Sequence, residues 1–366
     1  MLRVGSDFSG VGAFNQSLIR LGVQYKEVFA CDMDKYARQT FIHNYGEPEY
    51  YPTNVYDREI PSESLDIYMT SPPCQAFSLA GKRLGKDDKR GILFFNSHEF
   101  IQVNKPRFFI FENVKGLLSD DGGKTFQEWV NMLGGKSVNG VPVLFPYDEA
   151  VPYHLYWQVM NAKHHGVPQN RERVFLIGIR DDADNRFQFP REEHLTKRLK
   201  DVLEDEVDEK YFVINAKIEY LQRTEGTTFS VNANILYQEI PNESRTIQSG
   251  YHKSGRDVQY IKVKSATSKG YEEATEGDSI NFKNINSETR RGRVGKGVAQ
   301  TIESNNMSVG TLKHGQIRRL TPRECFRLMD FPDSFTWTVS ESQAYKQAGN
   351  SIVVNVLYKI LKQLPL

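Results

Sequence analysis

Hydrophobic and polar positions alternate in two distinct patterns along the first half of the chain. Short apolar runs are typical of buried strands, and apolar residues spaced three or four apart are typical of helices. Helices are expected over Ala13–Leu21 and Thr125–Leu133, the second closed by Gly134 and Gly135. The expected strands are Leu2–Ser6, Glu27–Cys31, Leu65–Thr70, Arg107–Phe111, His154–Val159 and Arg173–Ile179. Strands that alternate with helices predict an α/β fold.

The pattern changes after Arg180. From about residue 187 to residue 316, long apolar periods are rare, Asn, Ser, Thr and Gly are frequent, and short β-branched runs such as Tyr260–Val263 occur. Helical periodicity returns at Pro322–Met329 and Ser351–Leu364. We therefore expect residues 1–185 and 317–366 to form one α/β domain, with residues 186–316 inserted as a small, loop-rich, partly β domain.

Composition narrows the class of protein. The chain has 366 residues, of which 39% are hydrophobic and 25% charged, enough to bury a substantial core. No run approaches the roughly 18 apolar residues of a membrane span, and the N-terminus lacks a signal-peptide pattern. Three scattered cysteines fit neither a disulfide framework nor a zinc site. We expect a cytoplasmic monomer with no membrane partner and no metal.

Charge is informative only locally, because the net charge is +1. Residues 282–319 contain eight Lys and Arg residues against two acids, Glu288 and Glu303. This composition suits phosphate binding, and a solvated basic loop is the equally simple alternative.

Two features near the N-terminus favour a nucleoside ligand. Gly10 and Gly12 lie in a turn between the first strand and the first helix, where glycine permits close approach of a ligand to the backbone. Asp32 ends the second strand, where a carboxylate can accept both hydroxyls of a ribose. Each feature alone is also explained by ordinary turn chemistry or by a surface acid.

Candidate catalytic side chains follow the next strands. Cys74 comes after two prolines at a strand end, and a cysteine there is either a buried hydrophobe or, in a positive environment, a nucleophile. Glu112 follows the apolar strand that ends at Phe111, and the crevice at that edge would raise its pKa and let it donate a proton. Arg171 and Arg173 are candidates for the same crevice or for a structural ion pair.

Together these motifs resemble the cytosine-5 DNA methyltransferase family. Pro-Pro-Cys-Gln at 72–75, Glu-Asn-Val at 112–114 and Gln-x-Arg-x-Arg at 169–173 occur in the family's order, as do the segments 90–95, 319–325 and 347–351. The resemblance covers roughly residues 1–180 and 317–366. It implies a Rossmann-like S-adenosylmethionine-dependent methyltransferase sheet, with a target-recognition domain inserted between its two parts.

The resemblance also implies the activity, which is methyl transfer from S-adenosyl-L-methionine to carbon 5 of a flipped cytosine in a specific duplex DNA sequence. It assigns Cys74 as the nucleophile, Glu112 as the acid at ring nitrogen 3, and Arg173, helped by Arg171, as the group that steadies the base. A flipped nucleotide is needed because that face of the base is unreachable inside a duplex.

For the cofactor, the resemblance points to ten positions. Three residues nearby depart from the common pattern: Ala13 replaces a usual glycine, Met33 a frequent aromatic and Asn54 a common aspartate, although Asn54 keeps an acceptor oxygen. The implied cofactor-binding residues are Phe8, Gly10, Gly12, Asp32, Met33, Asn54, Val55, Leu93, Asn350 and Ser351.

For DNA, the resemblance points to a loop that closes over the base, residues 78–91, and to a Thr-aliphatic element in the insertion. Thr301 with Ile302 is ranked above the similar pair Thr246 and Ile247. Arginines beside it would read guanine edges or hold phosphates. The expected DNA-binding residues are Gln75, Ser78, Lys82, Arg290, Arg291, Arg293 and Thr301.

Two other functions are weighed against this one. A tRNA cytosine-5 methyltransferase of the DNA-methyltransferase-like type shares Pro-Pro-Cys-Gln and Glu-Asn-Val, but its Cys-Phe-Thr element is absent and the long basic insertion suits a duplex. A DNA-binding regulator without activity is disfavoured because Cys74, Glu112 and Arg173 are all present.

Overall fold

The computed structural model describes most of the chain. The described residues are 1–73, 92–183, 185–212, 261–283, 287, 289–304, 309–313 and 316–366. Four of the predicted site residues lie outside them, Cys74, Gln75, Ser78 and Lys82, and so does Thr246, the lower-ranked alternative to Thr301.

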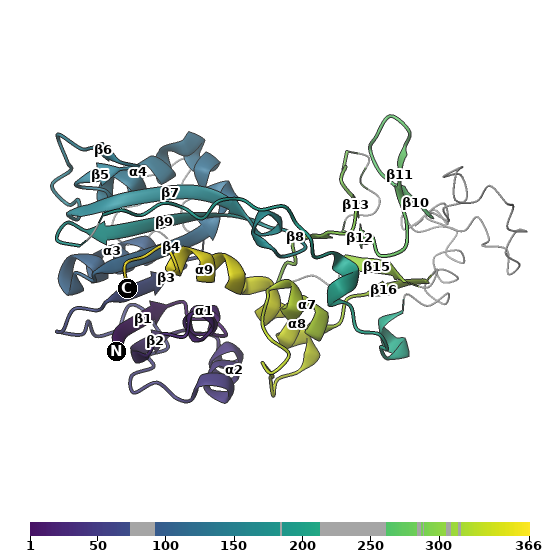
Figure 1. Cartoon of the computed structure of the whole chain (residues 1–366), viewed down its shortest axis with the longest axis horizontal. Helices are drawn as coiled ribbons and strands as arrows, with labels where there is room; N and C mark the ends of the chain where they lie inside the picture. Colours follow the sequence, from purple (N-terminus) through teal and green to yellow (C-terminus); the bar gives the residue numbers. More distant parts are fainter. Residues whose placement is uncertain are drawn as a thin grey trace, which may run out of the picture.

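An eight-stranded mixed sheet forms the centre of the larger part of the molecule (Figure 1). The first four strands in space are parallel, and β9 then runs antiparallel to both of its neighbours. In spatial order the strands are β2 (Tyr25–Cys31), β1 (Leu2–Asp7), β3 (Ile67–Thr70), β4 (Phe108–Val114), β9 (Glu172–Arg180), β7 (Tyr153–Asn161), β5 (Ser137–Val138) and β6 (Val141–Pro142). All six predicted strands are present, and the predicted α/β class is confirmed.

Helices cover both faces of this sheet. The parallel strands are apolar on both sides, as in β4, where Phe108 and Ile110 face one core while Phe109 and Phe111 face the other. The first core is closed by helices from both ends of the chain, α1 (Ala13–Leu21), α2 (Lys35–Tyr45), α7 (Pro322–Leu328), α8 (Glu341–Asn350) and α9 (Val354–Leu361). The second core is closed by α3 (Ile92–Asn104) and α4 (Lys124–Leu133).

The C-terminal helix packs against the N-terminal one. The hydroxyl of Ser17 in α1 donates to the carbonyl of Val354 at the start of α9, 3.1 Å away. Arg20, one turn further along α1, forms an ion pair with Asp330 and donates to Asn355. Residues after the insertion therefore complete the core that the first residues begin.

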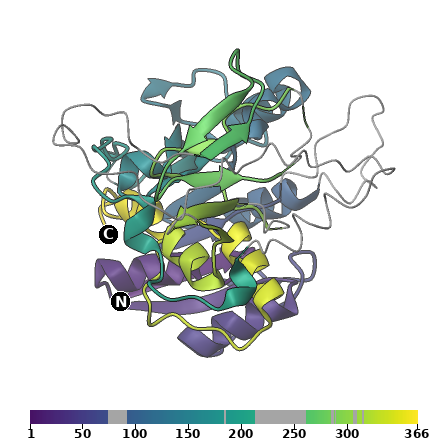
Figure 2. The same cartoon turned by 90° about the vertical axis from the view of Figure 1, so that its right-hand side faces the viewer.

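A second group of short strands lies at the other end of the molecule (Figure 1), and Figure 2 looks from that end. Four of them form a sheet in the order β13 (Val294–Gly295), β12 (Ser279–Asn281), β15 (Val309–Lys313), β16 (Gln316–Arg319). Two more form the hairpin β10 (Ile261–Lys264) and β11 (Tyr271–Ala274). The predicted partly β insertion is present, while the boundaries near residues 185 and 316 stay a prediction.

A two-stranded parallel pair joins the two parts. β8 (Gln169–Asn170), just before β9, pairs with β14 (Ala299–Gln300) of the insertion. Short helical turns complete the described structure, at Lys115–Gly123, Ala162–His165, Leu199–Val202 and Glu209–Tyr211. Within the described ranges, no helix is long and apolar enough to cross a bilayer.

Candidate active site

The turn after β1 is narrow and is tied to the end of β2. Phe8, Gly10 and Gly12 all have positive φ, at 56°, 56° and 84°. The amide of Gly10 donates to Asp32 Oδ2 at 2.8 Å. A Cβ on Gly12 would lie 2.2 Å from the ring of Tyr45, so both its conformation and its surroundings require glycine. The turn thus brings backbone amides close to a carboxylate.

Asp32 is held in place by backbone donors. Its Oδ1 accepts from the amide of Asp34 at 2.8 Å, while Oδ2 accepts from Gly10. Burial raises the pKa of the Asp32 carboxyl, and these two hydrogen bonds oppose the rise. Each oxygen has a further lone pair, so the carboxylate fits the hydroxyls of a ribose.

A buried ion pair fixes the end of β1, from which this turn begins. Asp7 ends β1 and is fully buried, and its Oδ1 lies 2.9 Å from Arg58 Nε. The hydroxyl of Tyr68 donates to Asp7 Oδ2 at 2.5 Å. Arg58 also lies over the ring of Phe100, 4.6 Å from its centroid. Sequence reasoning missed Arg58 and Tyr68, although a buried aspartate at a strand end is itself a signal that a cation must lie near it.

Four of the remaining cofactor candidates, Met33, Asn54, Val55 and Leu93, come from the first part of the chain. Met33 directly follows Asp32 and is 86% exposed. Asn54 Oδ1 accepts from the amide of Tyr56 at 3.0 Å and keeps one lone pair for a ligand. Val55 is buried and Leu93 half-buried, both against the second core.

Asn350 and Ser351 come from the far end of the chain. Asn350 is the last residue of α8 and is exposed, while Ser351 is buried. The Ser351 hydroxyl donates to the carbonyl of Ile352 at 3.2 Å. Their contact with a cofactor is untested and stays a prediction.

Glu112 is buried beside Arg173. Its Oε1 lies 3.1 Å from Arg173 Nε. Burial raises the pKa of the Glu112 carboxyl, and the positive charges of Arg173 and then Arg171 oppose that rise. The expectation that Glu112 follows its strand is wrong, because β4 continues to Val114, which pairs with Arg173. The antiparallel partner β9 extends the strand past its apolar part.

The chain before Cys74 lies next to β4. The side-chain amide of Asn113 donates to the carbonyl of Pro72 at 2.9 Å. This bond holds the end of β3 against the strand that carries Glu112. Pro73 is the last described residue before Cys74.

Arg171 is placed differently from Arg173. Its Nη1 donates to the carbonyl of Ile302 at 2.9 Å, and its Nη2 donates to those of Gly349 and Ser351 at 2.9 and 2.8 Å. Burial, followed by the positive charge of Arg173, lowers the pKa of Arg171 to about 9. The structure therefore gives Arg171 backbone partners, and a contact with the base stays untested.

Most of the Lys and Arg side chains of residues 282–319 form hydrogen bonds or ion pairs with other parts of the protein. Arg293 is 0% exposed and donates to the carbonyls of Asn281 and Lys283, so the predicted DNA contact of Arg293 is corrected. Arg318 forms a buried ion pair with Glu324 at 2.6 Å. Other cations of the region bond to protein oxygens: Lys283 to Glu303, Lys296 to Asp278, Lys313 to the Glu204 carbonyl and Arg319 to the Lys210 carbonyl.

The other predicted recognition residues keep some surface. Arg291 is exposed, and its Nε donates to the carbonyl of Ala266 at 2.8 Å. Arg290 is half-buried. Thr301 is half-buried, and its hydroxyl donates to the carbonyl of Asn170 at 2.8 Å.

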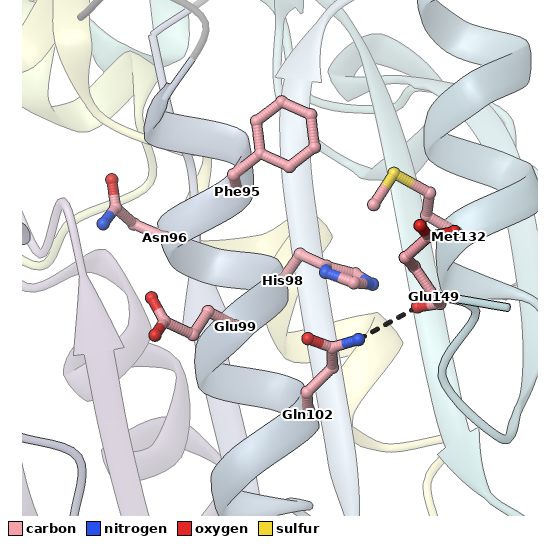
Figure 3. A pocket seen from close by; sticks show the side chains of 7 residues that line it. All are labelled: Phe95, Asn96, His98, Glu99, Gln102, Met132 and Glu149. Atoms are coloured by element: carbon pink, nitrogen blue, oxygen red, sulfur yellow. Dashed lines mark hydrogen bonds between the residues drawn. The ribbon is translucent and has the colours of Figure 1, made fainter. Parts of the chain in front are cut away.

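A pocket of about 330 Å³ lies beside α3 (Figure 3). The ring of His98 points from α3 toward Met132 and Glu149 (Figure 3). Its lining residues are Phe95, Asn96, His98, Glu99, Gln102, Met132 and Glu149, none of which is a predicted site residue.

Comparison with known proteins decides the family. The model of the C-5 cytosine-specific DNA methylase family matches residues 2–365. The chain belongs to this family. The enzyme is 32% identical to the orphan methyltransferase M.SPRI of Bacillus phage SPR, over 99% of this chain and 97% of that protein. It is also 32% identical to the type II methyltransferase M.HhaI of Haemophilus parahaemolyticus, over 96% of this chain and 91% of that protein.

Solved structures share the enzyme's fold. A putative DNA modification methyltransferase encoded within an E. coli prophage has a TM-score of 0.61 at 21% identity, covering 99% of this chain and 98% of its own. The Dnmt2 methyltransferase of S. pombe has a TM-score of 0.59 at 19% identity, covering 99% and 97%.

The enzyme is therefore a DNA (cytosine-5-)-methyltransferase, and S-adenosyl-L-methionine is its methyl donor. The narrow turn at Gly10 and the backbone-held carboxylate of Asp32 fit this nucleoside cofactor. Among the described residues, no group of three or more His, Cys, Asp or Glu side chains is arranged to hold a metal ion.

Proposed function

We propose that this methyltransferase acts through a covalent adduct between Cys74 and carbon 6 of the target cytosine, with Glu112 and Arg173 holding the base. The observation that carries this assignment is the buried Glu112–Arg173 pair, next to the strand end that leads into Cys74. A buried carboxyl beside a fixed guanidinium is a polar pair for one edge of a pyrimidine.

In this mechanism the thiolate of Cys74 adds to carbon 6 and breaks the aromaticity of the ring. Negative charge develops at ring nitrogen 3, and a proton held by Glu112 neutralises it. Carbon 5 thereby gains enamine character. S-adenosyl-L-methionine supplies the electrophilic methyl group. Transfer of the carbon 5 proton to solvent then breaks the bond between Cys74 and carbon 6, ring nitrogen 3 returns its proton to Glu112, and the aromatic ring is restored.

Arg173 has two tasks in this scheme. Its Nε faces Glu112, and its Nη1 donates to the carbonyl of Glu172 at 2.8 Å, so two contacts fix the guanidinium. A guanidinium that is already fixed can orient both Glu112 and the target cytosine. No side-chain entropy is then lost when the cytosine binds.

The cofactor assignment follows from the turn at the carboxyl end of the sheet. Asp32 would accept the ribose hydroxyls, and the backbone at Phe8, Gly10 and Gly12 would line the methionine part. Met33 and Asn54 would contact the adenine. Val55, Leu93, Asn350 and Ser351 would complete the site.

We further infer that residues 186–316 recognise double-stranded DNA and that the target cytosine is flipped out of the helix. Thr301, Arg290 and Arg291 would lie at the DNA, with Gln75, Ser78 and Lys82 from the segment after Cys74. One chain carries the residues for chemistry, cofactor and recognition, so a monomer suffices. A cytoplasmic location is consistent with the bacterial and phage sources of the relatives.

The direct test of the function is bisulfite sequencing of DNA from cells that express the protein. We expect protected cytosines at one short sequence throughout the genome, and none in cells that express Cys74→Ala. Protection that is absent, or that is equal in both cultures, contradicts the proposal.

Recognition can be tested with two neighbouring arginines that differ in burial. Arg291→Ala should weaken binding of cognate duplex and reduce the slope of log affinity against log salt by about 1, because an exposed phosphate contact is lost. Arg293→Ala should instead lower stability by about 1–3 kcal/mol, because the buried carbonyl of Asn281 and the partly buried carbonyl of Lys283 lose their donor. Fluorescence anisotropy at several salt concentrations and thermal melting measure the two effects.

Arg290→Ala provides a third variant beside this matched pair. If neither Arg290→Ala nor Arg291→Ala changes cognate affinity or its salt dependence, this loop does not contact DNA.

A further inference from the structure

Arg171 lies where three distant segments meet. Its two terminal nitrogens donate to the carbonyls of Ile302, Gly349 and Ser351, at 2.8–2.9 Å. Ile302 belongs to the insertion and adjoins Thr301. Gly349 and Ser351 flank Asn350 at the end of α8. Arg171 itself lies between β8 and β9, two residues before Arg173. One buried side chain therefore touches the recognition, cofactor and catalytic segments.

Gln169 and Asn170, which precede Arg171, make further contacts with residues 301–302 and one with the end of α7. Gln169 Oε1 accepts from the amide of Ile302 at 3.4 Å, and Gln169 Nε2 donates to the carbonyl of Leu328 at 2.7 Å. The hydroxyl of Thr301 donates to the carbonyl of Asn170. Figure 1 shows β8, which contains Gln169 and Asn170, between the large sheet and the small strands.

The approach of the two flanking segments is close. A Cβ on Gly349 would lie 2.5 Å from the carbonyl carbon of Glu303, so the end of α8 packs directly on the backbone after Ile302. Arg171, which directly precedes β9, donates to both of these packed segments. A shift of the segment at 301–303 would therefore break the bond from Arg171 Nη1 or move the backbone at Asn350 with it.

We propose that Arg171 is a positioning residue, which couples binding of DNA at the Thr301 segment to binding of S-adenosyl-L-methionine at the Asn350–Ser351 segment. The inference rests on the proposed function, because it takes those two segments as the DNA and cofactor sites. It replaces the expectation that Arg171 assists Arg173 at the base.

The physical basis is the shape of the guanidinium. Its planar fork places one nitrogen at the carbonyl of Ile302 and the other at those of Gly349 and Ser351. A lysine ammonium has all three of its N–H donors on a single nitrogen, so it cannot occupy both positions of the fork. The carbonyl of Ile302 belongs to the proposed DNA site, and those of Gly349 and Ser351 belong to the proposed cofactor site. When a ligand orders one of these segments, it also fixes Arg171, and Arg171 in turn orders the other segment. Such coupling must be reciprocal, so DNA strengthens cofactor binding by the same factor as cofactor strengthens DNA binding.

Arg171→Lys tests the proposal, with S-adenosyl-L-homocysteine as the cofactor probe. We expect the wild-type enzyme to bind its cognate duplex at least about fivefold more tightly when the probe is present, a coupling of ordinary size. In Arg171→Lys this factor should fall close to one, and KM for S-adenosyl-L-methionine should rise roughly tenfold. Calorimetry of each binary complex and of the ternary complex gives the coupling.

A duplex with an abasic target site separates coupling from base contact. If Arg171 acts through the backbone, Arg171→Lys loses the same factor on abasic and cytosine duplexes. A loss confined to the cytosine duplex, with cofactor affinity unchanged, overturns the proposal and restores Arg171 to the base.

Arg107→Lys is the matched control. Arg107 also donates to a carbonyl of the C-terminal segment, that of Pro365 at 2.9 Å, but it lies at the opposite end of β4 from Glu112. It should keep the wild-type coupling factor, and a loss equal to that of Arg171→Lys would mean that general loosening of the C-terminus explains the effect.

Gly349→Ala disturbs the same junction without altering Arg171, and it serves if Arg171→Lys does not fold. It too should lose the coupling, because its new Cβ displaces the backbone of Glu303. Retained coupling in this variant contradicts the proposal. If the wild-type enzyme methylates cytosine but shows no coupling, the inference fails alone, and if it does not methylate, the proposed function fails.

Discussion

Cys74→Ser should lose methylation by at least about 10³-fold, equivalent to roughly 4 kcal/mol of activation barrier. The serine hydroxyl is a far weaker nucleophile than a thiolate at neutral pH. A duplex with 5-fluorocytosine at the target position makes the covalent step visible. Fluorine cannot leave as the proton does, so the wild-type enzyme should methylate once, stay attached, and run as a shifted band on a denaturing gel.

Trapping should require S-adenosyl-L-methionine and should be absent in Cys74→Ser. Cys325→Ala is a suitable control, because Cys325 is buried in α7 and burial raises the pKa of its thiol far above neutrality. That variant should still be trapped. A Cys74→Ser protein that forms the band as well as wild type would show that another residue is the nucleophile.

Glu112→Gln should lower kcat by about 10²–10⁴-fold while cognate DNA binding is retained. The amide keeps the size of the carboxyl but cannot transfer a proton to ring nitrogen 3. Burial raises the pKa of Glu112, so the buried carboxyl holds its proton at higher pH than an exposed glutamate does, although Arg173 limits this gain. Single-turnover methylation and trapping with 5-fluorocytosine measure the slowed step.

Glu172→Gln is the matched control for Glu112→Gln. Glu172 is next to Arg173 in sequence, but its side chain is 42% exposed and pairs with Lys115 at 3.0 Å. Its loss removes a surface ion pair and should leave kcat near the wild-type value. Equal rates for Glu112→Gln and wild type would remove Glu112 from the mechanism.

The strands could be predicted because burial on both faces leaves continuous apolar runs. The boundaries of α1 were also predictable, since Gly12 and Gly22, both at positive φ, flank it. By contrast α3 was not predicted. Its sequence begins Ile-Leu-Phe-Phe and contains Phe100 and Ile101. Its apolar residues are therefore spread over several faces of the helix, and the spacing of three or four residues that marks an amphipathic helix is not clear.

Pairing between distant residues limited what could be predicted about the site. The motifs identified Glu112 and Arg173 as candidates, but the extent of β4 depends on its partner β9. Composition marked residues 282–319 as basic, yet the burial of Arg318 depends on Glu324, and that of Arg293 on carbonyls it reaches only after folding. Likewise, Arg58 is 51 residues from its partner Asp7.

The packing of α9 on α1 has a consequence for synthesis of the protein. The Ser17 hydroxyl and its partner carbonyl at Val354 are 337 residues apart. At roughly 5–20 residues per second, a ribosome needs roughly 20 to 70 s to make the intervening chain. Throughout that time α9 is not available to pack against the apolar side of α1 that includes Phe14 and Leu18. A nascent chain of this enzyme therefore presents a binding surface for chaperones until its last helix emerges.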